Sequence, residues 1–171
     1  MVEPVLIERE QMWLVGLSFF GDPFATSAGW TEENEIGRLW SRAMALLQHH
    51  SETLASRVVG GISYEVHIAD QEAITKGEFE VFVGVEVRDL DDVPLDFCVK
   101  VLPATPYAMF TLKGQEIVSD WDWEIEEAWM PVAGYRRSYA YIIQAYDERF
   151  VGLDRLDESA LDVLIPVQRV P

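Results

Sequence analysis

The stretch AYIIQAYD, at residues 140–147, has a counterpart earlier in the chain, SYEVHIAD at residues 63–70. Both stretches combine aromatic and β-branched residues in the alternating manner of a β-strand. When the two are aligned, His67 falls opposite Gln144. A second pair of similar stretches follows in the same order. FVGVEV, at residues 82–87, comes after SYEVHIAD, and VLIPVQ, at residues 163–168, comes after AYIIQAYD. Two pairs of similar segments in the same order indicate that the chain is a duplication of one smaller unit.

The predicted elements repeat one order, which is strand, helix, strand, strand. The first set covers about residues 4–88 and the second about residues 95–168. Each set has too few strands to bury both faces of its own sheet. We therefore expect a single α+β domain over residues 1–171, built from two β-α-β-β halves related by a pseudo-two-fold axis. It would have an antiparallel sheet, two long helices and a central ligand cleft where the halves meet.

Each half is predicted to contain one helix. In the first half Thr31 is expected to cap the helix, and Glu32 and Glu33 would then lie in the first turn, where negative charge suits the helix dipole. The second helix is predicted over residues 116–129 and is expected to stop or kink at Pro131. In the second half, the strand preceding this helix contains two prolines and is expected to bend there.

Composition and charge exclude several classes of protein. The formal net charge of -17 repels nucleic acids, and no cluster of Lys and Arg offsets it, so direct binding to DNA or RNA is not expected. The sequence has no apolar run of the roughly 18 residues needed to span a membrane, and no secretory signal, so we expect a cytoplasmic protein. Motifs for nucleotides and zinc are missing, so neither a cofactor nor a metal is expected.

Aromatic residues are abundant, with six Trp, six Tyr and eight Phe. Along the second predicted helix, Trp121, Ile125 and Trp129 fall on one stripe, which is typical of a core face. Trp123 lies about 200° around the helix from that stripe, so it either lies on the surface or lines a site. Acidic side chains beside aromatic faces suit a lipophilic cation. They also complement a helix dipole, and composition does not decide between these interpretations.

Several segments of the chain resemble the GyrI-like family of effector-binding domains, which includes the AraC-type and SBMC-type domains. The resemblance runs from about residue 4 to residue 168 and includes GISY, FEVFVGVEV, FCVKVLPATPYAMFTLKG, AWMPVAGY, IIQAYDERF and LDVLIPVQ. It implies a pseudo-symmetric fold whose central cleft binds small molecules that are often aromatic or cationic. Members occur fused to DNA-binding units or free-standing, and this chain, with no room for a DNA-binding domain, resembles the free-standing kind.

The resemblance also implies which residues meet the ligand. The family pattern Phe-Glu-x-Tyr-Asp, whose glutamate meets a ligand's positive charge, matches residues 143–147, with Gln144 in the place of the glutamate. A carboxamide carries no charge, so it favours a neutral polar guest and cannot serve as a general base. The family's Trp-Leu-Pro motif is kept as WMP and implies that Trp129 lines the cleft. The remaining aromatic candidates have a chemistry that suits a stacking wall, and ordinary core packing is the alternative for each of them: Tyr64, Phe82, Tyr107 and Tyr146.

Other side chains are candidates to replace the missing carboxylate. Glu65 lies two residues from His67 and therefore on the same side of its strand. Glu80 and Glu126 are further candidates. His67 is kept as a ligand-binding candidate because of its place opposite Gln144, although a strand histidine more often has a structural role.

Three functions follow from these interpretations. The leading hypothesis is a cytoplasmic binding protein for small aromatic or amphipathic molecules, acting as a sensor or sink without a catalytic residue. The second is a small-molecule hydrolase of the GyrI-like kind, in which Glu65 or His67 would activate water. The third is an acidic regulator that binds a basic protein partner, like a gyrase inhibitor. The sequence is compatible with a monomer and with a homodimer, since an exposed strand edge can pair two copies.

Overall fold

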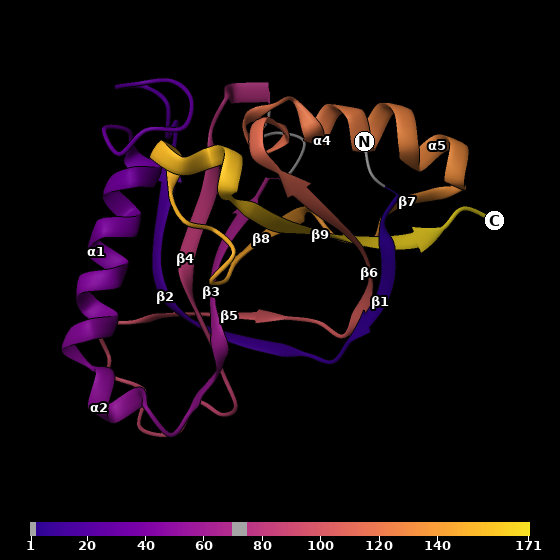
Figure 1. Ribbon diagram of the computed structural model, residues 1–171. Helices are drawn as coiled ribbons and strands as arrows, with labels where there is room; N and C mark the ends of the chain where they lie inside the picture. The colour runs from indigo at the N-terminus through magenta and orange to yellow at the C-terminus, as the bar shows by residue number, and fades with distance from the viewer. Residues whose placement is uncertain (1–2, 70–74) are drawn as a thin grey trace.

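A computed structural model describes residues 3–69 and 75–171 of the chain. The strands are β1 Val5–Arg9, β2 Met12–Gly21, β3 Val58–Ile68, β4 Phe79–Val87, β5 Cys98–Leu102, β6 Thr105–Lys113, β7 Tyr135–Arg137, β8 Tyr141–Tyr146 and β9 Ala160–Arg169. The helices are α1 Glu35–His49, α2 Ser51–Leu54, α4 Trp121–Trp123 and α5 Met130–Ala133, with a π-helical segment Glu124–Trp129 between the last two and 3₁₀ turns at Gly114–Val118 and Leu153–Glu158. Figure 1 shows their arrangement.

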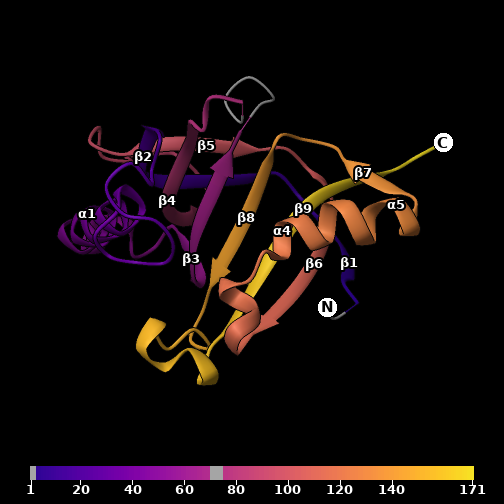
Figure 2. The same cartoon turned by 90° about the horizontal axis from the view of Figure 1, so that it is seen from above.

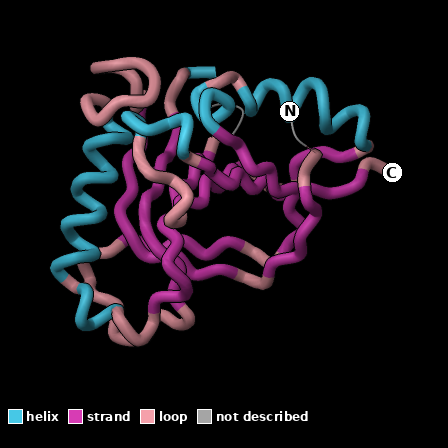
Figure 3. The backbone as a smooth tube through the Cα atoms, in the orientation of Figure 1, coloured by secondary structure: helices cyan, strands magenta, loops and turns pink. Residues whose placement is uncertain are grey.

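The strands form one antiparallel sheet in the order β1-β6-β9-β8-β3-β4-β2-β5, with β7 paired to the end of β9. The curl brings two long stretches of chain together: β1 pairs with β6, and the first half of β2 pairs with β5. The register is continuous, from Val5 opposite Met109 to Gly16 opposite Cys98. The second stretch bends at Pro103, between β5 and β6, as the sequence predicts. The result is a curled half-barrel with the helices outside it (Figure 3).

The two echoing stretches of the sequence lie side by side at the centre of the sheet. β3 pairs with β8 in an antiparallel ladder that runs from Ser63 opposite Tyr146 to Ile68 opposite Tyr141. Figure 2 shows this pair between α1 on one side and the α4–α5 helix on the other. The α+β class and the antiparallel sheet are confirmed. Asp70, the last residue of the earlier echo, lies outside the described residues.

Successive side chains along each strand point to opposite faces of the sheet, so the core forms separate layers on the two faces. On the outer face, α1 packs its buried Leu39 against Val81 and Val83 of β4. The α4–α5 helix covers the other half of that face, where its buried Ile125 joins the outward side chains of β6, β8 and β9. The inner face of the curl holds a third cluster that includes Tyr64, Phe82, Tyr107, Tyr141 and Ile143. Both helices therefore lie outside the curl, and the β3–β8 junction lies between them.

The second helix differs from its prediction at both ends. It starts at Trp121, after a separate 3₁₀ turn, and it continues past Pro131 to Ala133. Proline is tolerated there because it lies in the first turn of α5, and because the preceding turn is already wider than an α-helix. In that wide turn the Met130 N–H donates to the carbonyl of Ile125, five residues back.

Two glycines lie at a close approach of β2 and β4. Gly16 and Gly84 face each other across the ladder. A Cβ atom on Gly84 would lie 2.1 Å from the carbonyl oxygen of Val15, and one on Gly16 would lie 2.0 Å from that of Val83. The backbones therefore leave no room for a side chain at either position, and strand glycines of this kind allow a sheet to bend.

Candidate ligand-binding site

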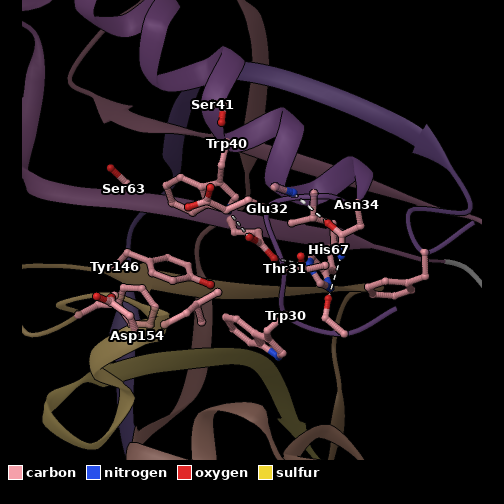
Figure 4. Close-up of a pocket in the computed structure, with 18 residues that line it drawn as sticks. Trp30, Thr31, Glu32, Asn34, Trp40, Ser41, Ser63, His67, Tyr146 and Asp154 are labelled. Carbon is pink, nitrogen blue, oxygen red and sulfur yellow. Dashed lines mark hydrogen bonds and ion pairs between the residues drawn. The ribbon is translucent and has the colours of Figure 1, made fainter. Parts of the chain in front are cut away.

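A cavity of about 820 Å³ lies over the β3–β8 junction, beside the N-terminal end of α1 (Figure 4). This volume is within the range of sites that enclose small molecules. The walls come from the loop before α1, the first turns of α1, the outward side chains of β3, the end of β8 and the segment after β8. The lining residues are Phe24, Gly29, Trp30, Thr31, Glu32, Asn34, Ile36, Gly37, Trp40, Ser41, Ser63, Glu65, His67, Tyr146, Phe150, Gly152, Leu153 and Asp154.

The floor of the cavity is built on the pair formed by Glu65 and Gln144, which are direct cross-strand partners in β3 and β8. Gln144 is 2% exposed, and its side-chain amide donates to Glu65 Oε1 at 3.4 Å. The hydroxyl of Tyr146 donates to Gln144 Oε1 at 2.9 Å. This second bond fixes which end of the carboxamide faces Glu65. Glu65 itself is only 4% exposed, so its carboxylate is held by the protein more than by water.

Two further donors meet the same carboxylate. The indole Nε1–H of Trp40, on α1, donates to Glu65 Oε2. His67 Nε2 lies 2.6 Å from Glu65 Oε1. A carboxylate accepts hydrogen bonds but does not donate them, and its two oxygens have enough lone pairs to accept all three of these bonds at once. The His67 ring also packs against Phe79 of β4, at 5.2 Å between centroids.

Aromatic rings line the cavity beside this carboxylate. Trp40 and Tyr146 meet edge to face at 4.8 Å, and Tyr146 meets Phe150 in the same way at 4.9 Å. Trp30 adds a further ring from the loop before α1 and is 37% exposed. Burial and the nearby Glu65 carboxylate raise the pKa of Tyr146 well above its ordinary value. The Tyr146 hydroxyl therefore stays protonated and remains a donor.

The charge in the cavity wall has one sign. Among the described residues that line it, none is Lys or Arg, whereas Glu32, Glu65 and Asp154 are acidic. Aromatic faces around a carboxylate can attract a cation through its charge and through the ring quadrupoles. The arrangement is therefore suited to an aromatic or amphipathic guest with a positive charge.

The start of α1 holds one wall of the cavity in place. The sequence predicts Thr31 as the cap of this helix, but Asn34 takes that position, and its side chain accepts from the Gly37 N–H at 3.0 Å. The Asn34 amide also donates to the carbonyl of Gly29 at 2.8 Å, which ties the loop to the helix. The Thr31 hydroxyl instead accepts from the Glu33 N–H in a local turn, a common alternative for threonine.

Substitution of Gly37 by alanine is expected to move this wall. A Cβ atom at that position would lie 2.4 Å from the Cα of Glu32 and 2.6 Å from the carbonyl oxygen of Thr31. The loop must shift to make room, while the Ala side chain suits the helix itself. We expect the protein to stay folded by circular dichroism and to bind a cavity ligand about tenfold more weakly by fluorescence titration, at a cost of about 1.4 kcal/mol. Unchanged affinity would mean that the loop takes no part in binding.

The structure brings four of the predicted site residues together, namely Gln144, Tyr146, Glu65 and His67. Three of them line the cavity, and Gln144 lies directly beneath, bonded to Glu65 and Tyr146. Of the other carboxylate candidates, Glu80 pairs with Lys100 and Glu126 pairs with Arg137, and neither lines the cavity.

The other predicted residues lie elsewhere. Tyr64, Phe82 and Tyr107 belong to the cluster on the inner face of the curl, with the sheet between them and the cavity. The Trp129 ring stacks on Tyr135 at 5.6 Å and meets Phe110 edge to face, and Trp123 is 63% exposed on α4. A ligand-binding role for these residues stays a prediction, and this cavity does not include them.

The sequence interpretation missed Trp40, Trp30, Asn34 and Phe150. Trp40 lies on the apolar side of α1, which packs on the sheet. The signal that distinguishes it is its indole N–H, which requires an acceptor when it is buried. Asn34 was recognisable as a good helix cap directly before an apolar periodic segment.

Two further properties concern the whole described chain. Within residues 3–69 and 75–171, no helix is long and apolar enough to span a membrane. In the same part of the chain, His, Cys, Asp and Glu side chains form no group of three or more that could hold a metal ion.

A family model matches nearly the whole chain. Residues 5–167 match the Cass2 family model, described as integron-associated effector binding protein. The transcriptional regulator BrlR of Pseudomonas aeruginosa is 28% identical over 165 residues, which cover 95% of this chain and 54% of the regulator. The chain therefore spans about half the length of this curated relative.

Two solved structures show the same fold at low sequence identity. SAV2435 bound to tetraphenylphosphonium superposes with a TM-score of 0.62 at 14% identity, covering 98% of this chain and 94% of that one. The integron cassette protein VCH_CASS2 of Vibrio cholerae gives a TM-score of 0.56 at 14% identity, covering 97% and 96% of the two chains. At this identity the likeness concerns the fold alone.

Proposed function

Since the chain belongs to the Cass2 family of integron-associated effector binding proteins, we propose that its cavity binds small aromatic cations and that Glu65 supplies the counter-charge. In this role the protein acts as a sensor or a sink, which holds its ligand without transforming it. The family supports small-molecule binding in general, and the cavity residues support the class of ligand.

The observation that carries the proposal is the environment of Glu65. Its carboxylate is almost buried, accepts hydrogen bonds from Trp40, His67 and Gln144, and lies in the lining of an aromatic cavity. No Lys or Arg among the described lining residues neutralises it. The negative charge that the resemblance leads one to expect at position 144 is thus present on the neighbouring strand, directly opposite.

The aromatic walls add affinity that does not depend on charge. A cation over an aromatic face gains about 0.5 to 2 kcal/mol, according to how far it is removed from water. Trp30 and Phe150 add apolar area to the walls that contain Trp40 and Tyr146. A structural relative, SAV2435, has been solved with tetraphenylphosphonium bound, a cation with four phenyl rings. This supports the same class of ligand here.

The geometry favours binding over hydrolysis. Both oxygens of Glu65 already accept hydrogen bonds from protein donors, so most of the positions at which the carboxylate could accept a proton from water are occupied. The carboxamide of Gln144 is too weakly basic to take a proton from water, so it cannot act as a general base. A hydrolase would need a less engaged base within reach of a bound substrate.

Titration with tetraphenylphosphonium tests the proposal, because Trp30 and Trp40 line the cavity and report ligand by fluorescence quenching. Glu65→Gln is expected to weaken binding of this cation about 10- to 30-fold, equal to about 1.4 to 2 kcal/mol, because it removes the counter-charge and keeps the size. Binding of the neutral triphenylphosphine oxide should change less than about threefold.

Glu126→Gln is the matched control, since Glu126 carries the same charge but lies outside the cavity, paired with Arg137. It should leave both affinities as they are in the wild type. If Glu65→Gln bound tetraphenylphosphonium as tightly as the wild type does, Glu65 would not be the counter-charge and the proposal would be wrong.

A further inference from the structure

We propose that His67 determines whether the cavity takes a cationic or a neutral guest. When His67 is neutral, the Glu65 carboxylate is available to a ligand's positive charge. When His67 is protonated, the imidazolium supplies that positive charge itself and the cavity favours neutral guests. The inference rests on the proposed function, because it concerns the specificity of the same carboxylate.

The geometry allows this exchange without movement of a side chain. His67 and Glu65 lie on the same side of β3, with His67 Nε2 at 2.6 Å from Glu65 Oε1. Since a carboxylate only accepts, Nε2 must carry a hydrogen in both forms of the ring. Protonation at the other ring nitrogen therefore keeps the hydrogen bond and turns it into an ion pair. The positions of the atoms stay the same while the net charge at the cavity floor changes.

His67 is the donor to Glu65 whose charge can change. Trp40 donates through an indole N–H and Gln144 through an amide, and both groups stay neutral at all ordinary pH values. Tyr146, which orients Gln144, has a pKa raised well above its ordinary value by burial and by Glu65. Histidine ordinarily changes charge between about pH 5 and pH 8.

The other groups around His67 do not compete for this role. Its cross-strand neighbours are the apolar Val81 of β4 and Ile142 of β8, and its ring packs on Phe79. The remaining charges of the described cavity wall are Glu32, on the loop before α1, and Asp154, after β8. Both are acidic and exposed, so neither supplies a positive charge to Glu65.

The sign of the coupling follows from these positions. A cation that pairs with Glu65 disfavours a proton on His67, so the complex binds fewer protons than the free protein. Affinity for the cation must then rise with pH, by up to about tenfold per pH unit while His67 is protonated in the free protein, and level off above. A neutral guest has no such linkage, because it leaves the ion pair intact.

Isothermal titration calorimetry of the intact chain with tetraphenylphosphonium measures this linkage directly. We expect the wild type to bind at least about fivefold more weakly near pH 5.5 than near pH 7.5, and to release up to about one proton per ligand, seen as heats that differ between buffers of different ionisation enthalpy. Triphenylphosphine oxide should show less than about a twofold change between the two conditions. His67→Gln keeps a donor near Glu65 but cannot titrate, so it should abolish the proton release and the pH dependence.

His50→Gln provides the matched control. His50 also pairs with a carboxylate, Asp96 at 2.9 Å, but it lies at the opposite end of α1 and outside the cavity. Its loss should leave the pH dependence of the wild type unchanged. The inference is overturned if wild-type affinity is equal at both pH values or no proton is released, a measurement that does not depend on how any variant folds. It is also overturned if His67→Gln keeps the wild-type pH dependence.

Failure of the proposed function gives a different result. In that case tetraphenylphosphonium does not bind near pH 7.5, or Glu65→Gln binds it like the wild type. A protein that binds the cation through Glu65 at every pH with constant affinity retains the proposed function and loses the inference about His67.

Discussion

Gly84→Ala is expected to lower the free energy of unfolding by more than about 4 kcal/mol, which is a large part of the total stability of an ordinary domain. The new Cβ atom would lie 2.1 Å from the carbonyl oxygen of Val15 and 2.8 Å from the Cα of Gly16. Both obstacles are backbone atoms of the paired strand, so no side-chain rotation relieves the clash. β2 and β4 would have to separate where the sheet curls, and β2 also holds β5 on its other edge.

Urea unfolding followed by far-ultraviolet circular dichroism measures this loss. Gly61→Ala is the matched control, because an added Cβ at Gly61 meets nothing within 4 Å. That variant should change the free energy of unfolding by less than about 1 kcal/mol. Equal stability of the Gly84→Ala and Gly61→Ala proteins would show that β2 and β4 are not in the close contact described here.

Trp40→Ala is expected to weaken tetraphenylphosphonium binding about 100-fold, equal to about 2.7 kcal/mol, which is typical of a central aromatic in a binding site. Trp40 acts in two ways. Its ring packs edge to face on Tyr146 at 4.8 Å in the cavity wall, and its indole N–H donates to Glu65. Truncation removes the ring from the ligand and leaves the Glu65 carboxylate with one donor fewer.

Trp129→Ala is the informative comparison, since the resemblance implies that Trp129 lines the cleft. Its ring packs between Phe110 and Tyr135 and is not part of the cavity wall. We expect Trp129→Ala to cost about 2 to 4 kcal/mol of stability and to change the tetraphenylphosphonium affinity of the folded protein by less than about twofold. A loss of affinity in Trp129→Ala that matches the loss in Trp40→Ala would move the binding site away from the cavity.

The general architecture could be predicted because it depends on local patterns. Alternation identifies the strands, and helical spacing identifies the two helices. The echo between the two stretches that became β3 and β8 indicates the duplication. The curl could not be predicted in the same way. It depends on the pairing of residues 5–16 with residues 98–109, and nothing in either segment specifies so distant a partner.

The site could be predicted in part. Glu65 and His67 were both candidates, because period two places them on one side of a strand. The same rule places Tyr64 on the opposite side of β3 from Glu65, in the cluster on the inner face of the curl, and a ligand-binding role for Tyr64 stays a prediction. Trp40 was missed because helical spacing predicts burial without showing which acceptor an indole N–H will meet. The resemblance implies that Trp129 lines the cleft. Its ring meets Phe110 and does not line the cavity described here, so its part in binding stays a prediction.

The continuous pairing of residues 5–16 with residues 98–109 also constrains the order in which the chain can assemble. During synthesis β1 has no partner until β6 has left the ribosome, about a hundred residues later. Contacts so distant along the chain are formed late and at a high entropic cost, so folding of this domain should be slow for its size. Until then the backbone of β1 is not paired with β6, and the side chains of Val5 and Leu6 are exposed. These two side chains remain exposed in the folded domain. The segment that precedes β5 and β6 is therefore expected to expose apolar surface until those strands are made, which is the kind of surface that chaperones bind.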